Sequence, residues 1–172
     1  DRQFDEAGKA IAKALELAPN SVPCLLAAAK IQEAQNNLLA AIETNTKLAT
    51  IDRRYRTEHL KKVAQIETRL GRREKALQAG RDVLASAPGN PDAHEFFAQL
   101  CFQLGAIDEG LETLRRQVRA NPSDPRGLMT LANALAEQFR TDEAIELFWR
   151  AFEKGDDVDA KLGVVQRLAE LY

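Results

Sequence analysis

The sequence predicts an all-α fold built from antiparallel helix pairs, with about ten helices in its 172 residues. The first observation is a fixed spacing. Pro88 and Pro122 lie 34 residues apart, and so do Gly71 and Gly105. The second is that apolar residues between these positions follow the 3.6-residue period of a helix. No window alternates apolar and polar residues as a half-buried strand would. A fixed period of this length is typical of a repeat architecture.

Residues 91–124 show the repeating unit most clearly. An apolar stripe with helical spacing occupies 96–104, and Gly105 then ends the first helix, since glycine tolerates the left-handed conformation that many helix ends need. A second stripe occupies 107–118, with Asp108 in its capping region. Pro122 ends the second helix, because the residue before a proline is disfavoured in helical geometry. The unit is therefore a helical hairpin.

The same register divides the whole chain. One small residue recurs near the start of each second helix: Ala7, Ala41, Ala76, Gly110 and Ala144. We expect a single array over 1–172, with full pairs at 22–56, 57–90, 91–124 and 125–158. Residues 1–21 are expected to form the second helix of a partial pair, and residues 159–172 the first helix of another. The array is therefore expected to be a piece of a longer protein. The pair at 22–56 diverges most, with Asn37 expected at its inner turn.

These positions together resemble the tetratricopeptide repeat. In that family the second helix opens with an acidic residue, a charged residue and a small residue, which here read Asp5-Glu6-Ala7, Glu74-Lys75-Ala76, Asp108-Glu109-Gly110 and Asp142-Glu143-Ala144. The family's proline after that helix matches Pro19, Pro88 and Pro122, and its small first-helix residue matches Ala29, Ala64, Ala98 and Ala132. Its large first-helix aromatic residue is missing. The resemblance covers essentially the whole chain and implies a right-handed superhelical solenoid whose first helices line a concave groove.

The resemblance implies a non-catalytic protein–protein interaction scaffold that docks a peptide or protein segment in this groove. The family's inward positions fall on Lys30, Lys61, Gln65, Arg69, Glu95, Gln99, Phe102, Met129 and Asn133, and also on Leu26, Glu33, Thr68, Gln103, Glu137, Arg167 and Glu170. Amides suit an extended peptide, because each can both donate and accept a hydrogen bond. The cation and amide pattern with which some family members hold a terminal carboxylate is not matched, and Glu95 is expected to repel such a ligand.

Alternative roles stay open at this stage. The chain could be a regulatory or substrate-presenting arm of a larger multidomain enzyme, or a homo-oligomerising spacer. The groove side chains could also be merely solvated. Trp149 follows the core position Phe148, and we expect it either to form an interface or to pack on the next repeat. Apolar residues at the two ends are expected to lack packing partners and to permit weak self-association: Phe4, Ile11, Leu168 and Leu171.

Composition argues against several other classes. The net charge of −2 gives no global basic field for nucleic acid or a membrane surface. The longest uncharged apolar run is about six residues, far below the roughly 20 that span a bilayer. Residues 52–75 hold nine basic and four acidic side chains around Tyr55, which we expect to serve solubility. No nucleic-acid or membrane partner is expected.

The chain shows no recognisable catalytic or metal-binding motif. His59 and His94 lack the spacing of metal ligands, and no nucleophile–base pair or glycine-rich phosphate loop is present. We expect no enzyme activity, no cofactor and no metal. Cys24 and Cys101 lie two repeats apart, so two free thiols are expected. Free thiols favour a reducing compartment such as the cytoplasm.

Overall fold

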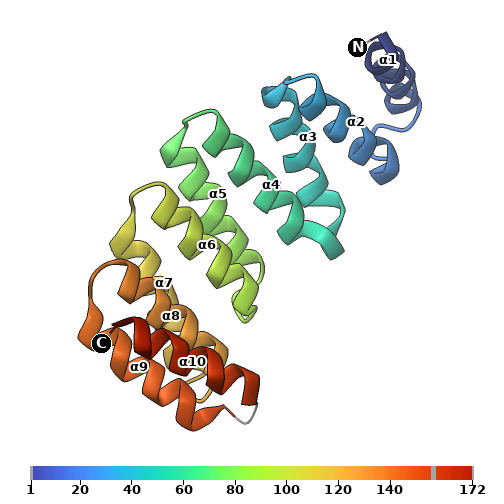
Figure 1. The fold of residues 1–172 in the computed structure, drawn as a ribbon. Helices are drawn as coiled ribbons and strands as arrows, with labels where there is room; N and C mark the ends of the chain where they lie inside the picture. Colours follow the sequence, from blue (N-terminus) through green and yellow to red (C-terminus); the bar gives the residue numbers. More distant parts are fainter. Residues whose placement is uncertain (1, 156–157, 172) are drawn as a thin grey trace. The chain divides into compact units, whose positions relative to one another are not determined.

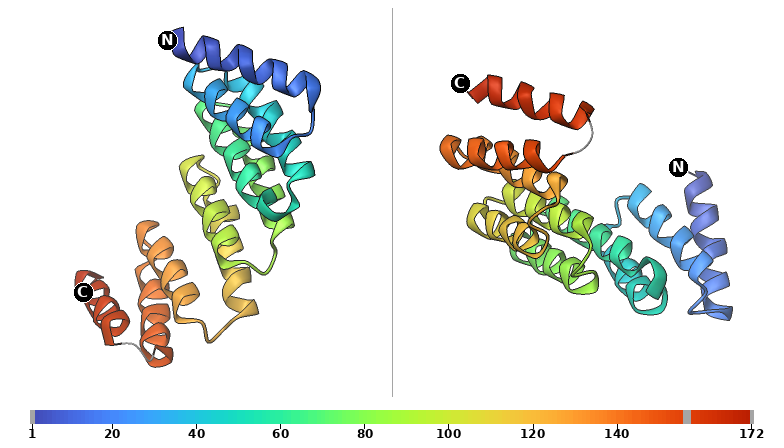
Figure 2. Two further views of the ribbon diagram at one scale, coloured as in Figure 1. Left: turned by 90° about the vertical axis from the view of Figure 1, so that its right-hand side faces the viewer. Right: turned by 90° about the horizontal axis from the view of Figure 1, so that it is seen from below.

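The computed structural model of the protein describes residues 2–155 and 158–171. These residues form ten α-helices and one short 3-10 helix, with no strand among them (Figures 1 and 2). The predicted all-α helical repeat solenoid is therefore confirmed. The chain divides into two compact units, Asp1–Pro88 and Gly89–Tyr172. A single continuous array over 1–172 stays a prediction.

The helices of the first unit are α1 (Arg2–Leu17), α2 (Val22–Ala34), α3 (Leu38–Ile51), α4 (Arg56–Arg69) and α5 (Arg73–Ser86), with the 3-10 helix η1 (Arg53–Tyr55) before α4. The second unit contains α6 (Pro91–Gln103), α7 (Ile107–Ala120), α8 (Pro125–Glu137), α9 (Thr141–Lys154) and α10 (Val158–Leu171). In each unit short turns join successive helices into hairpins, in which α2, α4, α6 and α8 are the first helices (Figure 1).

The inner turn of every hairpin contains one residue in the left-handed region. Gly71 and Gly105 have φ of 68° and 73°, and Asn36 and Phe139 both have φ of 58°. Asn37 lies in this turn, as predicted, and the left-handed residue is its neighbour Asn36. The spacing from Asn36 to Gly71 is 35 residues, because α4 begins one residue earlier in the register, beside η1. Asparagine accepts the left-handed conformation more readily than most residues, whereas Phe139 adopts it at an energetic cost.

Helix starts are capped at the outer turns of the second unit. The Asn90 side chain accepts a hydrogen bond from the amide of Asp92, and the Asp124 side chain accepts from the amides of Arg126 and Gly127. A capping role for Asp108 was predicted wrongly. The N-cap residue of α7 is Ala106, so Asp108 lies within the first helical turn, where its charge is favourable to the helix dipole.

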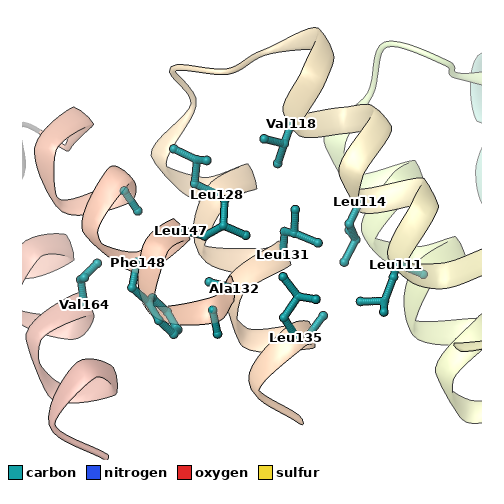
Figure 3. Packing of buried hydrophobic residues seen from close by; sticks show 14 of the residues in the cluster. Leu111, Leu114, Val118, Leu128, Leu131, Ala132, Leu135, Leu147, Phe148 and Val164 are labelled. Carbon is teal, nitrogen blue, oxygen red and sulfur yellow. The ribbon is translucent and has the colours of Figure 1, made fainter. Parts of the chain in front are cut away.

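The core of the second unit joins all five of its helices, with Ala98 as the buried residue from α6 (Figure 3). Leu111 and Leu114 of α7 pack with the leucines of α8, with Leu147 and Phe148 of α9, and with Val164 of α10. The expectation that Leu168 lacks packing partners was wrong, since it is only 5% exposed in this core. The rotation of α10 instead exposes Leu162 and Val165, at 56% and 46%. Leu171 is half-buried against the same core, and the Phe4 side chain lies outside the described residues.

The first unit contains smaller apolar clusters at successive helix contacts. Leu25 and Ala29 of α2 pack on Leu48 of α3. Leu38 and Ala41 of α3 pack on Ile66 of α4, with Ile42 and Leu70 half-buried against them. Ala41 and Ala76, at the small position of the repeat, are fully buried. A larger side chain at such a position would push the helices of the hairpin apart.

Candidate functional site

The predicted site residues lie on the surfaces of the first helices, and we call these the first-helix surfaces: α2 and α4 in the first unit, and α6, α8 and α10 in the second. Exposed positions are Lys30, Gln65, Arg69 and Gln99, and half-buried positions are Lys61, Glu95, Phe102, Met129 and Asn133. The exposed positions therefore carry long amide and basic side chains.

Arg126 connects α6 to α8 on the first-helix surface of the second unit. Its Nη2 atom donates to Oδ1 of Asp92 and to Oε2 of Glu95, each at 2.8 Å. Thr130 Oγ1 also donates to Oε1 of Glu95 at 3.3 Å. The hydrogen bond to Glu95 and then that to Asp92 raise the pKa of the Arg126 guanidinium above its ordinary value. Arg126 shares its single positive charge between the two carboxylates, so the repulsion that Glu95 is expected to exert on a ligand carboxylate is reduced in part.

Arg126 was missed in the sequence, although a signal was available. It lies 34 residues after Asp92, so the two stand at the same register position of successive first helices. Opposite charges at equivalent positions of neighbouring repeats are placed to form an ion pair. This pairing ties α6 and α8 together through side chains that reach solvent.

A small cavity connects α8 to α10 on the same surface. Its volume is about 70 Å³, and its lining includes Asn133 and Glu137 of α8 together with Arg167 and Glu170 of α10. Arg167 Nη1 donates to Glu170 Oε2 at 2.8 Å. All four side chains were predicted at inward positions, so the structure brings these residues together. The cavity offers an amide, a guanidinium and two carboxylates within one short stretch of surface.

Phe102 and Met129 serve the core as well as the surface, since both are half-buried against the apolar cluster of the second unit. The Phe102 ring lies on Gly110 of α7, where an added Cβ atom would come within 2.6 Å of the ring. A structural role therefore accounts for the burial of Phe102, and its contact with a ligand stays a prediction.

Trp149 of α9 is half-exposed, and its ring contacts a residue of its own helix, so both roles expected for it stay predictions. Its side chain is 47% exposed, and its ring packs edge-on against Phe152 with 5.9 Å between centroids. The other partner of the Phe152 ring is Lys161 of α10, whose Nζ atom lies 5.2 Å from the centroid. A half-exposed tryptophan held by packing resembles an interface anchor, and this role stays a prediction.

The basic segment of the first unit is partly engaged in local pairs. Lys61 Nζ donates to Glu58 at 3.0 Å, and the guanidinium of Arg54 lies 5.3 Å from the centre of the Tyr55 ring. His59 is buried, and its Nε2 atom lies 3.1 Å from Oδ2 of Asp52. This contact gives His59 a packing role between the start of α4 and the end of α3.

Residues 2–155 and 158–171 are the part of the chain that the structure describes. Within that part of the chain no group of three or more His, Cys, Asp or Glu side chains could hold a metal ion. No helix found there has the length and apolarity to cross a membrane. Cys24 is half-buried and Cys101 is buried, and neither of the two is in a disulfide.

Solved structures with the same fold are helical repeat proteins. MamA is 24% identical over 88% of each chain, with a TM-score of 0.61. YrrB, described as a tetratricopeptide repeat protein with an unusual peptide-binding site, is 15% identical over 96% of this chain and 84% of its own, with a TM-score of 0.58. TTC0263, a thermophilic tetratricopeptide repeat protein of Thermus thermophilus, is 21% identical over 96% and 91%, with a TM-score of 0.57.

The sequence comparison identifies the repeat itself. Residues 68–134 match the family model of the tetratricopeptide repeat. None of the curated protein sequences compared with the chain matches it. Residues 68–134 therefore have the sequence of a tetratricopeptide repeat, and the solved structures show that the chain shares the helical repeat fold.

Proposed function

We propose that the protein is a non-catalytic scaffold that docks a peptide or protein segment on its first-helix surfaces. One observation carries the proposal: polar side chains of three successive first helices meet in the second unit. Arg126 joins α6 to α8, and the cavity lined by Asn133 and Arg167 joins α8 to α10. A repeat protein that presents one such surface over several helices is suited to an extended ligand.

The chemistry of the surface favours a peptide backbone as ligand. Gln99 and Asn133 each offer a donor and an acceptor, as the N–H and C=O groups of an extended chain require. Arg126 holds both Asp92 and Glu95, and its single positive charge offsets one of the two negative charges that a ligand meets there. The peptide-binding site named for YrrB is in keeping with a protein or peptide partner here.

A selection from a random peptide library tests the proposal. Peptides retained by the protein are labelled with fluorescein and titrated by fluorescence anisotropy. The combined substitutions Gln99→Ala and Asn133→Ala are expected to weaken binding at least about tenfold. Phe102 stays unchanged in this test, because its removal would also disturb the packing on Gly110.

The matched control carries Gln78→Ala and Glu153→Ala, at exposed positions of the second helices α5 and α9. It is expected to bind the peptides as the unchanged protein does. Both variants should keep their helical circular dichroism signal. Binding that survives the first-helix substitutions but is lost in the control would place the docking surface on the second helices and refute the proposal.

A further inference from the structure

The contact between α1 and α2 in the first unit is open. A cavity of about 550 Å³ lies between the two helices, within the range of about 300–1,000 Å³ that is usual for ligand sites. Its lining consists of Gly8, Lys9, Ile11, Ala12 and Leu15 from α1, and of Ala28, Ile31, Gln32, Gln35 and Asn37 from α2 and the turn after it. None of these residues belongs to the site proposed above.

The next contact of the same kind, between α3 and α4, shows why this one is open. In the repeat register, Ile42 of α3 stands at the position of Gly8, and Leu70 at the end of α4 stands at the position of Gln35. Ile42 and Leu70 are packed against the cluster that contains Ile66. At the α1–α2 contact, glycine and an amide replace these two large apolar side chains. The apolar contact that closes the α3–α4 junction is therefore missing.

The remaining wall of the cavity is more apolar than its counterpart. Ile11 and Leu15 of α1 stand where α3 carries Asn45 and Ala49. Ile31 faces them from α2, and its Cγ2 atom is 3.9 Å from the position of a Cβ atom on Gly8. Compared with α3, α1 therefore has a smaller side chain at Gly8 and larger apolar side chains at Ile11 and Leu15. A wall of this kind gains free energy when an apolar group displaces water from it.

The rim of the cavity is polar and carries a single charge. Thr44 Oγ1 donates to Oε1 of Gln32 at 2.8 Å. Lys9 is exposed and is the one charged residue in the lining, where the register position in α3 is occupied by Glu43. An apolar wall beside one ammonium group is complementary to an apolar group that carries a neighbouring negative charge.

We propose that this cavity binds a peptide segment through a bulky apolar side chain that stands next to an acidic residue. The apolar side chain fills the space beside Gly8, and the carboxylate lies at Lys9. The inference rests on the proposed function, since the ligand is a peptide, but it uses residues of α1 and α2 that the first-helix test leaves unchanged. A short apolar and acidic motif is thereby the expected feature of the partner.

Two substitutions of Gly8 distinguish the effect of filling the cavity from the effect of changing the stability of α1. Gly8→Ile introduces the residue that closes the α3–α4 contact, whereas Gly8→Ala adds a single methyl group at ordinary contact distance from Ile31 and Gln35. Both replace a glycine inside a helix, which favours the helical state, so neither is expected to unfold α1. A loss of binding seen only with isoleucine therefore reports the cavity.

The probe is 1-anilinonaphthalene-8-sulfonate, which has an apolar aromatic body and one negative charge. Its fluorescence should rise with the unchanged protein and with Gly8→Ala, and its affinity should fall at least about tenfold with Gly8→Ile. Lys9→Ala should weaken the probe severalfold, while Lys13→Ala, at an exposed position of the same helix outside the lining, should not. Library peptides that displace the probe should share a bulky apolar residue beside an acidic one.

Three results would overturn the inference. The first is equal probe affinity for the unchanged protein and Gly8→Ile. The second is displacement by peptides without the apolar and acidic pair. The third is a doubled mass by light scattering that Gly8→Ile abolishes, because a second copy would then occupy the cavity. Retained probe binding in the Gln99→Ala, Asn133→Ala variant, together with its loss of peptide, supports two separate sites, so each proposal can fail alone.

Discussion

The pair formed by Phe102 and Gly110 should be energetically coupled. In the hairpin of α6 and α7, a Cβ atom on Gly110 would lie 2.6 Å from the Phe102 ring and 3.1 Å from the backbone oxygen of Ala98. The same two register positions are occupied by Ala136 and Ala144 in the next hairpin. The third hairpin therefore combines a large ring with the smallest residue, where the fourth combines two alanines.

The sign of the Gly110→Ala effect follows from two opposing terms. Alanine in place of glycine inside a helix stabilises by about 0.5–1 kcal/mol. Overpacking of a filled contact costs about 1–3 kcal/mol. The substitution should therefore lower the free energy of unfolding by about 0.5–2 kcal/mol in the unchanged protein. With Phe102→Ala already present, the ring is gone and the approach of 3.1 Å to the backbone oxygen of Ala98 remains, so Gly110→Ala should be less destabilising than in the unchanged protein by about 1–3 kcal/mol.

Urea unfolding followed by circular dichroism measures both effects, provided that the slope of the transition is unchanged between variants. The double-mutant cycle should give a coupling free energy of about 1–3 kcal/mol. Ala144→Gly is the control, and it should destabilise by about 0.5–1 kcal/mol because no ring opposes the alanine there. A stabilising effect of Gly110→Ala in the unchanged protein, or an equal effect in both backgrounds, would refute the reasoning.

Two further predictions concern a turn and an exposed ion pair. Phe139 is 92% exposed with φ of 58°, so Phe139→Gly should raise the free energy of unfolding by about 1 kcal/mol. Gly105 has φ of 73° at the equivalent turn of the preceding hairpin, so Gly105→Ala should lower the free energy of unfolding by a similar amount. Changes of the opposite sign in urea unfolding would contradict this. The hydrogen bond from Arg119 lowers the pKa of the Glu112 carboxyl group, with a further contribution from Arg116. A lowered folded-state pKa stabilises above the unfolded pKa, and this stabilisation is lost as pH falls through the folded pKa. In Arg119→Ala the Glu112 pKa should rise toward its ordinary value in an NMR titration of the side-chain carboxyl carbon, and an unchanged titration would show that the pair is not formed in solution.

Most of the fold could be predicted because its determinants are local. Apolar periodicity, glycines at inner turns and prolines at outer turns act within one hairpin, and each hairpin contacts only its neighbours. Residues 91–124 were thus divided correctly into two helices. The spacing of 34 residues could not show that the left-handed residue of the first inner turn is Asn36, because the chain has one extra residue, which lies at the start of α4.

The candidate site was predictable only as a set of positions. Asn133, Glu137, Arg167 and Glu170 do meet around one cavity, as the repeat register implied. Arg126 and Glu95 are 31 residues apart in sequence. Their pairing depends on side-chain rotamers, which are decided by the packing of α6 on α8. Repeat position alone could not show that this pairing compensates part of the Glu95 charge.

The sequence by itself determined that this protein is a series of helical hairpins, since helix period and turn residues are properties of short segments. Only the tertiary structure decided which side chains fill the contacts between hairpins. Leu168 became buried and Leu162 exposed through the rotation of α10. Gly8 and Gln35 leave a cavity because they meet across two helices. The burial of Leu168 and the cavity at Gly8 both depend on residues that come together only when the helices pack. How densely such a contact is filled is decided by the side chains from both helices together.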